Sequence, residues 1–209
     1  QSVFLDMFGD NHTGVPSGVK MMKLDDALEC IIDYRGKTPT KTAAGVPLVT
    51  AKIVKGGRIA PATEFIAEAD YVAWMRRGLP KIGGVVFTTE APLGEVARID
   101  NAGVALAQRL VLLRGKAELL DNGYLQQVLQ LPLTRHQLLQ RSTGSTVIGI
   151  RQKELRKVEI PVPPIVEQRR VTLAAVGVER LRDSARVAIS QLDTLFAALQ
   201  SAAFAGTLF

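Results

Sequence analysis

Residues 158–170 read VEIPVPPIVEQRR, and the character of the chain changes across them. Each proline disfavours a helical conformation in the residue before it, which predicts an extended segment ahead of Pro164. Pro164 is suited to the first turn of a helix, and Glu167 complements the positive end of the helix dipole. The stretch therefore predicts a boundary between a globular domain, residues 23–164, and a long helix, residues 165–206.

The C-terminal region carries a heptad repeat of apolar residues. Ten positions with the spacing of coiled-coil a and d positions are all apolar and define a seam: Val171, Ala174, Val178, Leu181, Ala185, Ala188, Leu192, Leu195, Leu199 and Ala202. Such a repeat is typical of a coiled coil. A helix of about 40 residues is about 60 Å long, so we expect a helical partner, from another chain or from another part of a longer one. The alternative is packing along its own domain.

The globular part combines strand and helix signals. Hydrophobic residues make up 47% of the chain and charged residues 22%, which is ordinary for a soluble globular protein. Short apolar runs between turn-forming residues predict strands at residues 46–50, 84–88, 94–99 and 106–113. Apolar residues at helical spacing predict helices at residues 24–33, 122–130 and 133–141. We expect a mixed α+β domain followed by the long helix.

The first residues have a different composition. Residues 1–9 are rich in apolar side chains and stop at Gly9, which predicts the end of a preceding helix or a short tail. Residues 10–22 begin with turn-forming residues and are expected to form a linker. We therefore expect either a fragment cut from a longer chain or a short tail ahead of the domain.

Several function classes are disfavoured by composition and motifs. No window of about 18 uncharged apolar residues occurs, so we expect no transmembrane helix and no membrane partner. Cys30 is the only cysteine and there are two histidines, which argues against a disulfide framework, a cysteine-based zinc site and a multi-histidine metal site. No nucleophile elbow, HExxH motif or glycine-rich cofactor loop is present. We expect a cytoplasmic protein with no catalytic site and no cofactor or metal of its own.

The charge balance favours a polyanionic partner, although a soluble basic surface is the simpler alternative. Lys and Arg number 26 against 20 Asp and Glu, giving a net charge of +6. Basic residues cluster at residues 35–58 and 135–157, and each cluster contains a run of hydroxyl and glycine residues. Such runs can bring backbone N–H groups and hydroxyls to phosphates or base edges. If the two clusters share one face, they form a binding surface for double-stranded DNA.

The candidate DNA-binding residues follow from side-chain chemistry. Candidate phosphate contacts are the basic residues Arg35, Lys37, Lys52, Lys55, Arg58, Arg141, Arg151 and Lys153. Candidate base contacts are Thr38, Thr40, Thr89, Glu90, Gln108, Arg109, Thr143, Ser145 and Thr146. Arginine and glutamine suit bidentate contacts with base edges, and glutamate accepts a hydrogen bond from cytosine.

The order of four motifs resembles the DNA-specificity subunits of type I restriction–modification systems. These motifs are GSTVIGI at residues 144–150, KEL at 153–155, VEIPVPP at 158–164 and EQRR at 167–170. RGKTPT at residues 35–40 resembles the opening of a target-recognition domain of that family. IGGVVF at 82–87 and GEVA at 94–97 resemble its central strands, with Gly84 in the common Asp position. Residues 199–206 resemble the end of a conserved region, and residues 1–10 the end of an earlier one.

The resemblance implies one target-recognition domain and a conserved helical region that forms an antiparallel coiled coil. It implies a non-catalytic subunit that reads one part of a split DNA target and docks the modification subunits through its long helix. Partner subunits would use S-adenosylmethionine for adenine methylation and ATP for restriction. A specificity subunit has two recognition domains and this chain has one. The chain is therefore either the C-terminal half of a longer subunit or a half-length subunit that pairs with a second copy.

Two other functions stay open from the sequence. One is a coiled-coil dimerisation scaffold whose basic charge is incidental. The other is a small domain of a DNA adenine methyltransferase, which the missing Asn/Asp-Pro-Pro-Tyr-type motif and cofactor loop disfavour. DNA binding that falls with salt separates the first from a specificity subunit, and S-adenosylmethionine binding by the isolated chain separates the second.

Overall fold

The computed structural model describes residues 19–34 and 38–205. The expected preceding helix at residues 1–9, most of the expected linker at 10–22, and the candidates Arg35 and Lys37 lie outside the described residues. The chain forms two compact units, one that reaches to Thr172 and one that begins at Leu173. We call them the globular unit and the helical unit and describe each by itself.

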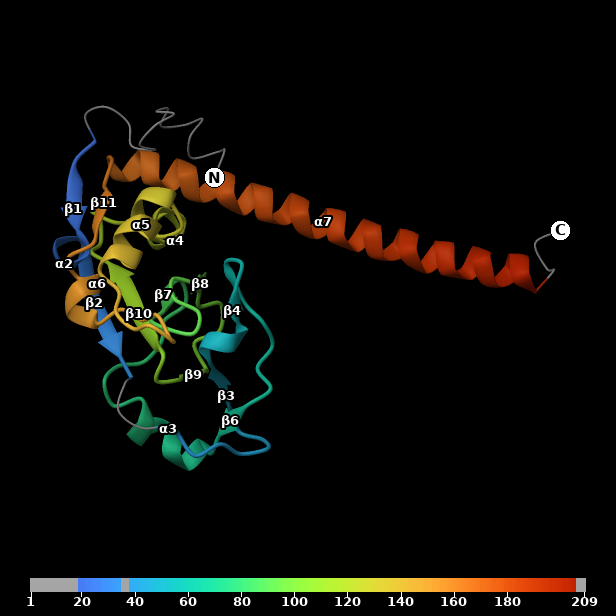
Figure 1. Cartoon of the computed structure of the whole chain (residues 1–209), viewed down its shortest axis with the longest axis horizontal. Helices are drawn as coiled ribbons and strands as arrows, with labels where there is room; N and C mark the ends of the chain where they lie inside the picture. Colours follow the sequence, from blue (N-terminus) through green and yellow to red (C-terminus); the bar gives the residue numbers. More distant parts are fainter. Residues whose placement is uncertain (1–18, 35–37, 206–209) are drawn as a thin grey trace. The chain divides into compact units, whose positions relative to one another are not determined.

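A four-stranded antiparallel sheet is the centre of the globular unit (Figure 1). Its strands follow the order β2 (Leu28–Asp33), β10 (Leu110–Gly115), β7 (Val85–Thr88) and β8 (Val96–Arg98). Side chains of a strand alternate between the two faces of a sheet. Both faces are covered here: Val111 and Leu113 of β10 belong to one core cluster, while Leu110 and Leu112 belong to the other. This explains why the strands read as continuous apolar runs.

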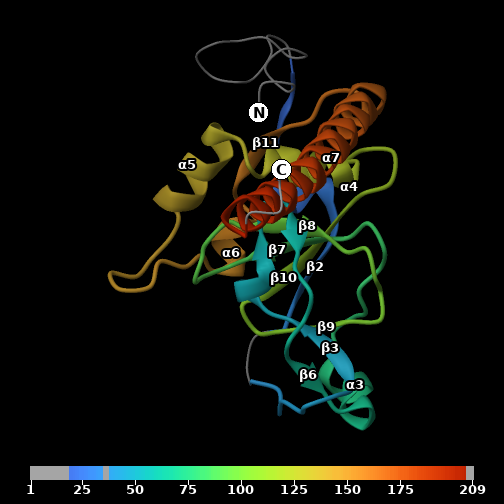
Figure 2. The ribbon, with the colours of Figure 1, turned by 90° about the vertical axis from the view of Figure 1, so that its right-hand side faces the viewer.

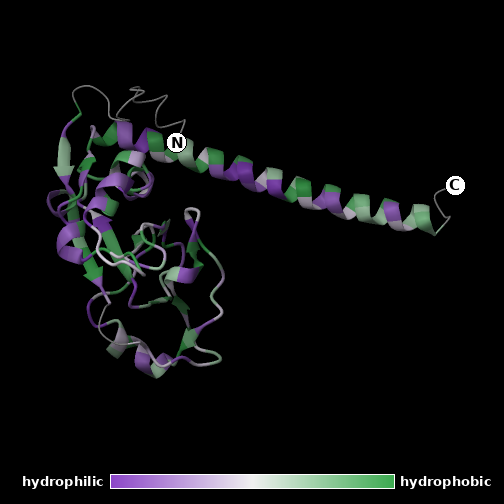
Figure 3. Ribbon diagram, viewed as in Figure 1, coloured by the Kyte–Doolittle hydropathy of each residue, from purple (hydrophilic) through white to green (hydrophobic). Residues whose placement is uncertain are grey.

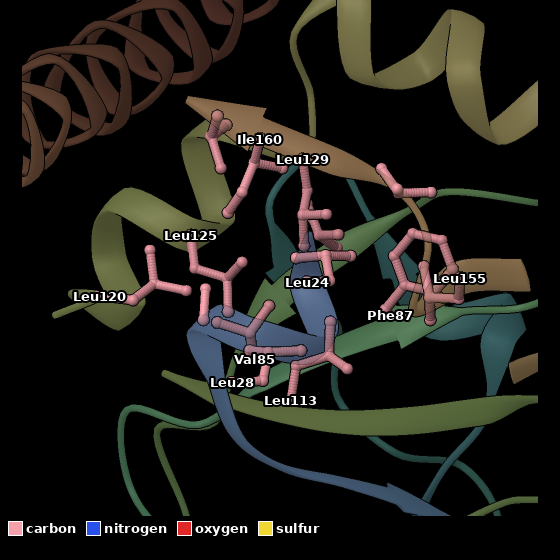
Figure 4. Close-up of a cluster of buried hydrophobic side chains, with 14 of the residues drawn as sticks. Leu24, Leu28, Val85, Phe87, Leu113, Leu120, Leu125, Leu129, Leu155 and Ile160 are labelled. Atoms are coloured by element: carbon pink, nitrogen blue, oxygen red, sulfur yellow. The ribbon is translucent and has the colours of Figure 1, made fainter. Parts of the chain in front are cut away.

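Helices cover the first face of the sheet. The elements on this side are α2 (Leu24–Ala27), α4 (Asn122–Val128), α5 (Pro132–Gln140), α6 (Gln152–Leu155) and β11 (Glu159–Pro161). Figure 4 shows Leu125 of α4 and Ile160 of β11 in the same cluster as Val85 and Leu113 of the sheet. Tyr124 is fully buried beside them, and its hydroxyl donates to the carbonyl oxygen of Pro161 at 2.9 Å.

Smaller elements cover the second face. They are β3 (Val46–Val49), η1 (Ala51–Ile53), the hairpin β4 (Val54–Lys55) and β5 (Arg58–Ile59), β6 (Phe65–Ile66), α3 (Glu68–Trp74) and β9 (Ala105–Leu106). Strand β3 pairs with β6 antiparallel and with β9 in parallel. The indole N–H of Trp74 donates to the carbonyl oxygen of Leu106 at 2.9 Å and fastens α3 beside β9. Figures 1 and 2 show α3, β3, β6 and β9 together at one end of the globular unit.

The first strand of the globular unit lies beside the last one. Strand β1 (Met21–Lys23) pairs antiparallel with β11, so that Met21 lies opposite Pro161. The N–H of Val162 continues the ladder by donating to the carbonyl oxygen of Lys20 at 2.8 Å. Residues 20–23 and 159–162 therefore form one two-stranded clasp.

A single helix, α7 (Ile165–Phe204), follows the clasp. Its first turns belong to the globular unit, where Gln168 and Val171 are buried. Figure 3 shows hydrophobic and hydrophilic residues alternating along the helix. An 18-residue window of α7 has a mean hydropathy of 1.2, so its length and composition alone would allow a membrane span. One such helix is weak evidence for a membrane protein.

The predicted fold class, a mixed α+β domain with a long C-terminal helix, is confirmed. The helix predicted at residues 24–33 is wrong beyond α2, because residues from Leu28 onward form strand β2. Pairing of β2 with β10 outweighs the helical spacing of the apolar residues, and the β-branched Ile31 and Ile32 suit a strand. Val171 does not extend an exposed seam, since it is packed in the globular core.

Candidate nucleic-acid interface

Several strands end at the same edge of the globular unit. Because β7 and β10 are antiparallel with Thr88 opposite Leu110, the end of β7 meets the start of β10. Strand β2 also ends there, since Asp33 lies opposite Val111. The parallel strands β3 and β9 end together, and the N–H of Ala107 donates to Val49. Loops that follow four strands and precede a fifth thus approach one another, and we call this region the loop edge.

The first of two hollows at the loop edge has a volume of about 380 Å³. Its polar lining comes from Thr38, Lys41, Thr50, Lys52, Glu64, Gln108 and Arg109. The ammonium group of Lys41 lies 2.8 Å from a carboxylate oxygen of Glu64. The amide nitrogen of Gln108 donates to the hydroxyl of Thr38 at 3.1 Å, so the segment after β2 is tied to the segment after β9. We call this the Lys52 hollow.

The second hollow has a volume of about 500 Å³. It is lined by Thr89, Glu90, Gln108, Thr143, Gly144, Val147, Gly149, Ile150 and Arg151. Gln108 lines both hollows, so they are neighbours across its side chain. We call this one the Arg151 hollow. Basic groups, an acid, hydroxyls, an amide and the apolar Val147 are the side-chain types that contact phosphates, base edges and thymine methyl groups.

The wall of the Arg151 hollow is a narrow loop. Thr143 and Gly149 exchange two backbone hydrogen bonds, of 2.9 and 3.0 Å, which close the loop between them. Gly144 has a φ of +111°, and a Cβ atom there would lie 2.1 Å from the carbonyl oxygen of Val147. Glycine is therefore required at residue 144 for the loop to turn. The exposed Ser145, Thr146, Val147 and Ile148 occupy its tip.

An arginine–glutamate pair lies where the two hollows meet. The Nε atom of Arg109 is 3.0 Å from Oε1 of Glu90, and both side chains are about half exposed, at 49% and 41%. The buried Thr89 fixes the backbone of this arginine, because its N–H and its hydroxyl both donate to the carbonyl oxygen of Arg109. Gly149 forms a β-bridge with Glu90, and a Cβ atom on this glycine would lie 3.1 Å from the glutamate Cβ. The backbone of Arg109 is thus held by Thr89, and that of Glu90 by Gly149.

The electrostatics of the hollows favour an anion. Their lining contains the basic residues Lys41, Lys52, Arg109 and Arg151 against the acids Glu64 and Glu90. Two of the four basic groups are paired with these acids, while the side chains of Lys52 and Arg151 are exposed. No group of three or more His, Cys, Asp or Glu residues that could hold a metal ion occurs in the part of the chain that is described.

The second basic cluster is partly neutralised outside the hollows. Lys157 donates to both carboxylate oxygens of Glu154, at 3.0 and 3.2 Å. This hydrogen bonding, together with the nearby positive charges, holds the pKa of Glu154 below its usual value. Glu154 therefore stays negative at neutral pH and offsets one positive charge beside Lys153.

About half of the described candidate residues lie in the two hollows. The structure places Thr38, Lys52, Thr89, Glu90, Gln108, Arg109, Thr143 and Arg151 there. Seven others do not line either hollow: Thr40, Lys55, Arg58, Arg141, Ser145, Thr146 and Lys153. Lys55 and Arg58 lie opposite each other on the β4–β5 hairpin, and the Nε atom of Arg141 is buried without a hydrogen-bond partner among the described residues.

Sequence reasoning missed three polar lining residues as candidates, Lys41, Thr50 and Glu64, and among the apolar ones Val147 in the loop wall. Lys41 lies within the first basic cluster, and Thr50 is the last residue of a predicted strand, so a signal existed for both. Val147 lies inside the quoted GSTVIGI motif, but an apolar residue was not considered as a base contact. Glu64 had no sequence signal, because its role depends on pairing with Lys41 across a distance of 23 residues.

The comparison with protein families identifies the class to which this architecture belongs. The family model described as "Type I restriction modification DNA specificity domain" matches residues 16–172. This match covers most of the chain, and the chain belongs to that family. No curated protein sequence shows a significant match.

Solved structures show the same fold. The HsdS subunit from Thermoanaerobacter tengcongensis matches with a TM-score of 0.60 at 20% identity, covering 99% of this chain and 50% of that one. A chain from a structure on complex assembly and conformational transition of the type I R-M system gives 0.63 at 22% identity, with 99% and 53% covered. The S subunit from M. genitalium gives 0.54 at 16% identity, with 81% and 42% covered. The chain thus spans about half the length of these matched chains.

Proposed function

We propose that this chain is the DNA sequence-recognition part of a type I restriction–modification complex and has no catalytic role itself. The observation that carries the proposal is the loop edge. In a chain of the DNA specificity family, two adjoining hollows gather arginine, lysine, glutamine, glutamate and threonine side chains from six separate segments. Residues 20–164 act as the target-recognition domain, because the expected linker ends before the clasp that contains Met21 and Met22. Residues 10–19 act as a linker after the segment at 1–9, and residues 165–206 act as a spacer.

The loop edge divides DNA contacts by chemistry. Lys52 and Arg151, on exposed rims, bind phosphates and set the register of the protein on the duplex. The side chains between them read base edges in the major groove, where each base pair presents a distinct pattern of donors and acceptors. One such edge reads one part of a split target.

The spacer acts through its apolar seam. Leu181, Leu192 and Leu195 of α7 are exposed by more than half, as is Phe196 beside the seam. Exposed apolar residues at heptad spacing are stabilised by burial against another helix. We assign this role to an antiparallel helix from a second copy of the chain or from another half of a longer one. The same helix pair docks the modification subunits.

The chemistry belongs to partner subunits in this proposal. The modification subunits bind S-adenosylmethionine and methylate adenine, and a restriction subunit that uses ATP completes the complex. The chain itself takes no cofactor, and the complex works in the cytoplasm on double-stranded DNA.

The test is to express the subunit that contains this chain with its modification subunit in a methylation-free host and to map methylated adenines across the genome. We expect a single split motif. A palindromic motif means that two copies of this recognition domain read both parts, whereas an asymmetric motif means that a second, different domain reads the other part. Absence of methylation, with both subunits folded and soluble, overturns the proposal.

A dimerisation scaffold with incidental charge is the competing function, and the exposed apolar face of α7 is the observation that favours it. DNA affinity measured against salt separates the two. A specificity subunit loses affinity linearly on a log–log plot, with a slope of about −0.9 for each phosphate contact. For Lys52→Ala or Arg151→Ala we expect weaker binding to all sequences and a slope that is shallower by about 1. Helix-mediated association without salt-dependent DNA binding indicates the scaffold.

A further inference from the structure

We propose that Arg109 reads a guanine of the target and that Glu90 is the residue that positions it. This inference rests on the proposed function and assigns one base contact within the loop edge. Its basis is the geometry of the pair, which lies at the meeting point of the two hollows and is half exposed.

The pairing with Glu90 leaves the two terminal nitrogens of Arg109 available for a base. Glu90 engages the Nε atom of Arg109 at 3.0 Å, on the side of the guanidinium group nearest the backbone. The two terminal nitrogens, Nη1 and Nη2, make no hydrogen bond within the described part of the chain. A planar group with paired N–H donors matches the O6 and N7 acceptors of guanine in the major groove. No other base offers two acceptors side by side on that edge.

The backbone around the pair is rigid, so the arginine is held before DNA arrives. The carbonyl oxygen of Arg109 accepts two hydrogen bonds from Thr89, at 2.9 and 3.1 Å. Leu110, the next residue, is fully buried and begins β10, whose first four residues are buried. On the other side, the N–H of Ile150 donates to the carbonyl oxygen of Thr89 at 2.9 Å. This bond holds the end of the loop between Thr143 and Gly149 against the segment that carries Glu90. Because the ion pair with Glu90 restricts the long side chain, less conformational entropy is lost on contact with a base.

The charge of Glu90 argues against a phosphate contact by Arg109. A carboxylate at 3.0 Å offsets the positive charge of the guanidinium group and repels phosphate oxygens. The exposed and basic Lys52 and Arg151 suit phosphates better, and they flank the pair, one in each hollow. Arg109 is paired with Glu90 and lies between the proposed phosphate contacts Lys52 and Arg151. It is therefore placed to reach a base edge.

The test selects duplexes from a randomised DNA pool with the complex of the full subunit and its modification subunit. We expect the wild-type complex to enrich a motif with an invariant guanine at one position. Arg109→Ala is expected to lose the preference at that position alone, by roughly tenfold to a hundredfold. Glu90→Ala is expected to weaken the same preference, and Glu90→Gln to weaken it less, because the amide keeps a polar oxygen of the same reach beside Nε without the negative charge.

The matched control is Arg169→Ala. Arg169 also pairs with a glutamate, Glu118, at 3.0 Å and is half exposed, but it lines neither hollow. We expect this variant to keep the full motif. Circular dichroism confirms that each variant is folded.

A chemical probe tests the contact without any substitution. In the selected duplex, 7-deazaguanine replaces the assigned guanine and removes the N7 acceptor. We expect the wild-type complex to lose affinity and the Arg109→Ala complex to be indifferent to the change. Equal affinity of the wild-type complex for both duplexes overturns the inference.

Two further outcomes distinguish a wrong role for Arg109 from a wrong function for the chain. If Arg109→Ala weakens binding to every sequence equally, or if the wild-type motif contains no guanine, the inference is wrong and the specificity function stands. If the wild-type complex enriches no motif, the proposed function itself fails.

Discussion

Tyr124 links the layers of the core through a single side chain. Its backbone N–H donates to the carboxylate of Asp121 at 2.9 Å, which caps α4. Its ring is fully buried, and its hydroxyl donates to the carbonyl oxygen of Pro161 in β11. Burial raises the pKa of Tyr124 well above its ordinary value, because the phenolate would be removed from water.

The raised pKa predicts a loss of stability at high pH. Above the ordinary tyrosine pKa of 10.0, the unfolded chain releases a proton that the folded chain retains. The free energy of unfolding therefore falls as the pH rises beyond that value. Tyr124→Phe is expected to lower stability at pH 7 by about 1–3 kcal/mol, since the carbonyl of Pro161 loses its partner, and to flatten the alkaline fall. Urea unfolding from pH 7 to 11 measures both effects.

If the free energy of unfolding of Tyr124→Phe falls as steeply at alkaline pH as that of the wild type, the prediction is wrong. Burial also raises the pKa of Tyr34, whose hydroxyl donates to Gly78 at 2.6 Å. Tyr34→Phe is thus the matched variant, and we expect each substitution to remove part of the fall.

The sequence predicted part of the candidate site, and the reason is visible in particular residues. Thr89 and Glu90 directly follow the predicted strand at residues 84–88. Gln108 and Arg109 lie inside the predicted strand at 106–113, but in the structure they precede β10, and the pairing of β7 with β10 brings the two pairs to a common edge. The partnership of Glu90 with Arg109 did not follow, because side-chain direction depends on the close approach of Gly149.

At the scale of elements, long buried strands were predictable and short ones were not. The predicted runs at residues 84–88 and 106–113 contain β7 and most of β10, whose residues are buried on both faces. Two-residue strands such as β5 and β6 carry no periodicity and exist only through their partners. The helix wrongly predicted over β2 has the same cause. Strand β2 forms by pairing with β10, which is distant in sequence, so the local spacing of apolar residues gives no sign of it.

The first turns of α7 are held by one amide side chain. Gln168 is fully buried; its Oε1 accepts from the N–H of Asp121 at 2.9 Å, and its Nε2 donates to Leu119 at 2.9 Å and Pro163 at 2.7 Å. Thr172, one turn further on, also hydrogen-bonds to the carboxylate of Asp121. These contacts join α7 to the entry of α4 within the globular unit.

Gln168→Ala is expected to destabilise the globular unit by about 3 kcal/mol, because one buried and two part-buried backbone groups lose their partner. Thermal unfolding followed through Trp74, the single tryptophan, measures the effect. Gln191→Ala is the matched control in the same helix, since Gln191 is exposed and a surface substitution changes stability by about 0.5 kcal/mol or less. Equal melting temperatures of the two variants would contradict this role of Gln168.

At the scale of the whole molecule, charge is distributed unevenly along α7. Between residues 165 and 186 the helix carries eight charged side chains, whereas Asp193 is the only one between residues 187 and 204. The C-terminal half also holds Leu192, Leu195, Phe196 and Leu199, each exposed by nearly half or more. Burial against a partner helix is therefore expected to be concentrated in this half.

The seam makes a prediction about assembly. Leu192→Glu combined with Leu195→Glu is expected to abolish helix-mediated association, because two charges would be buried at the seam. Sedimentation velocity measures the association, and urea unfolding of the globular unit is expected to stay unchanged. Ser190→Glu with Ala197→Glu adds the same charges on the opposite face of the heptad and is expected to leave association intact. Equal loss of association in both double variants would exclude the seam as the contact.

The clasp of β1 and β11 determines how the globular unit responds to mechanical force. Lys20 and Val162 lie next to each other at the open end of the clasp, and the paired residues run from there toward Lys23 and Glu159. A pull that separates these two residues loads the hydrogen bonds one at a time, from the open end inward, as a zipper opens. Tension from a longer chain would thus peel the clasp sequentially before the central sheet carries any load.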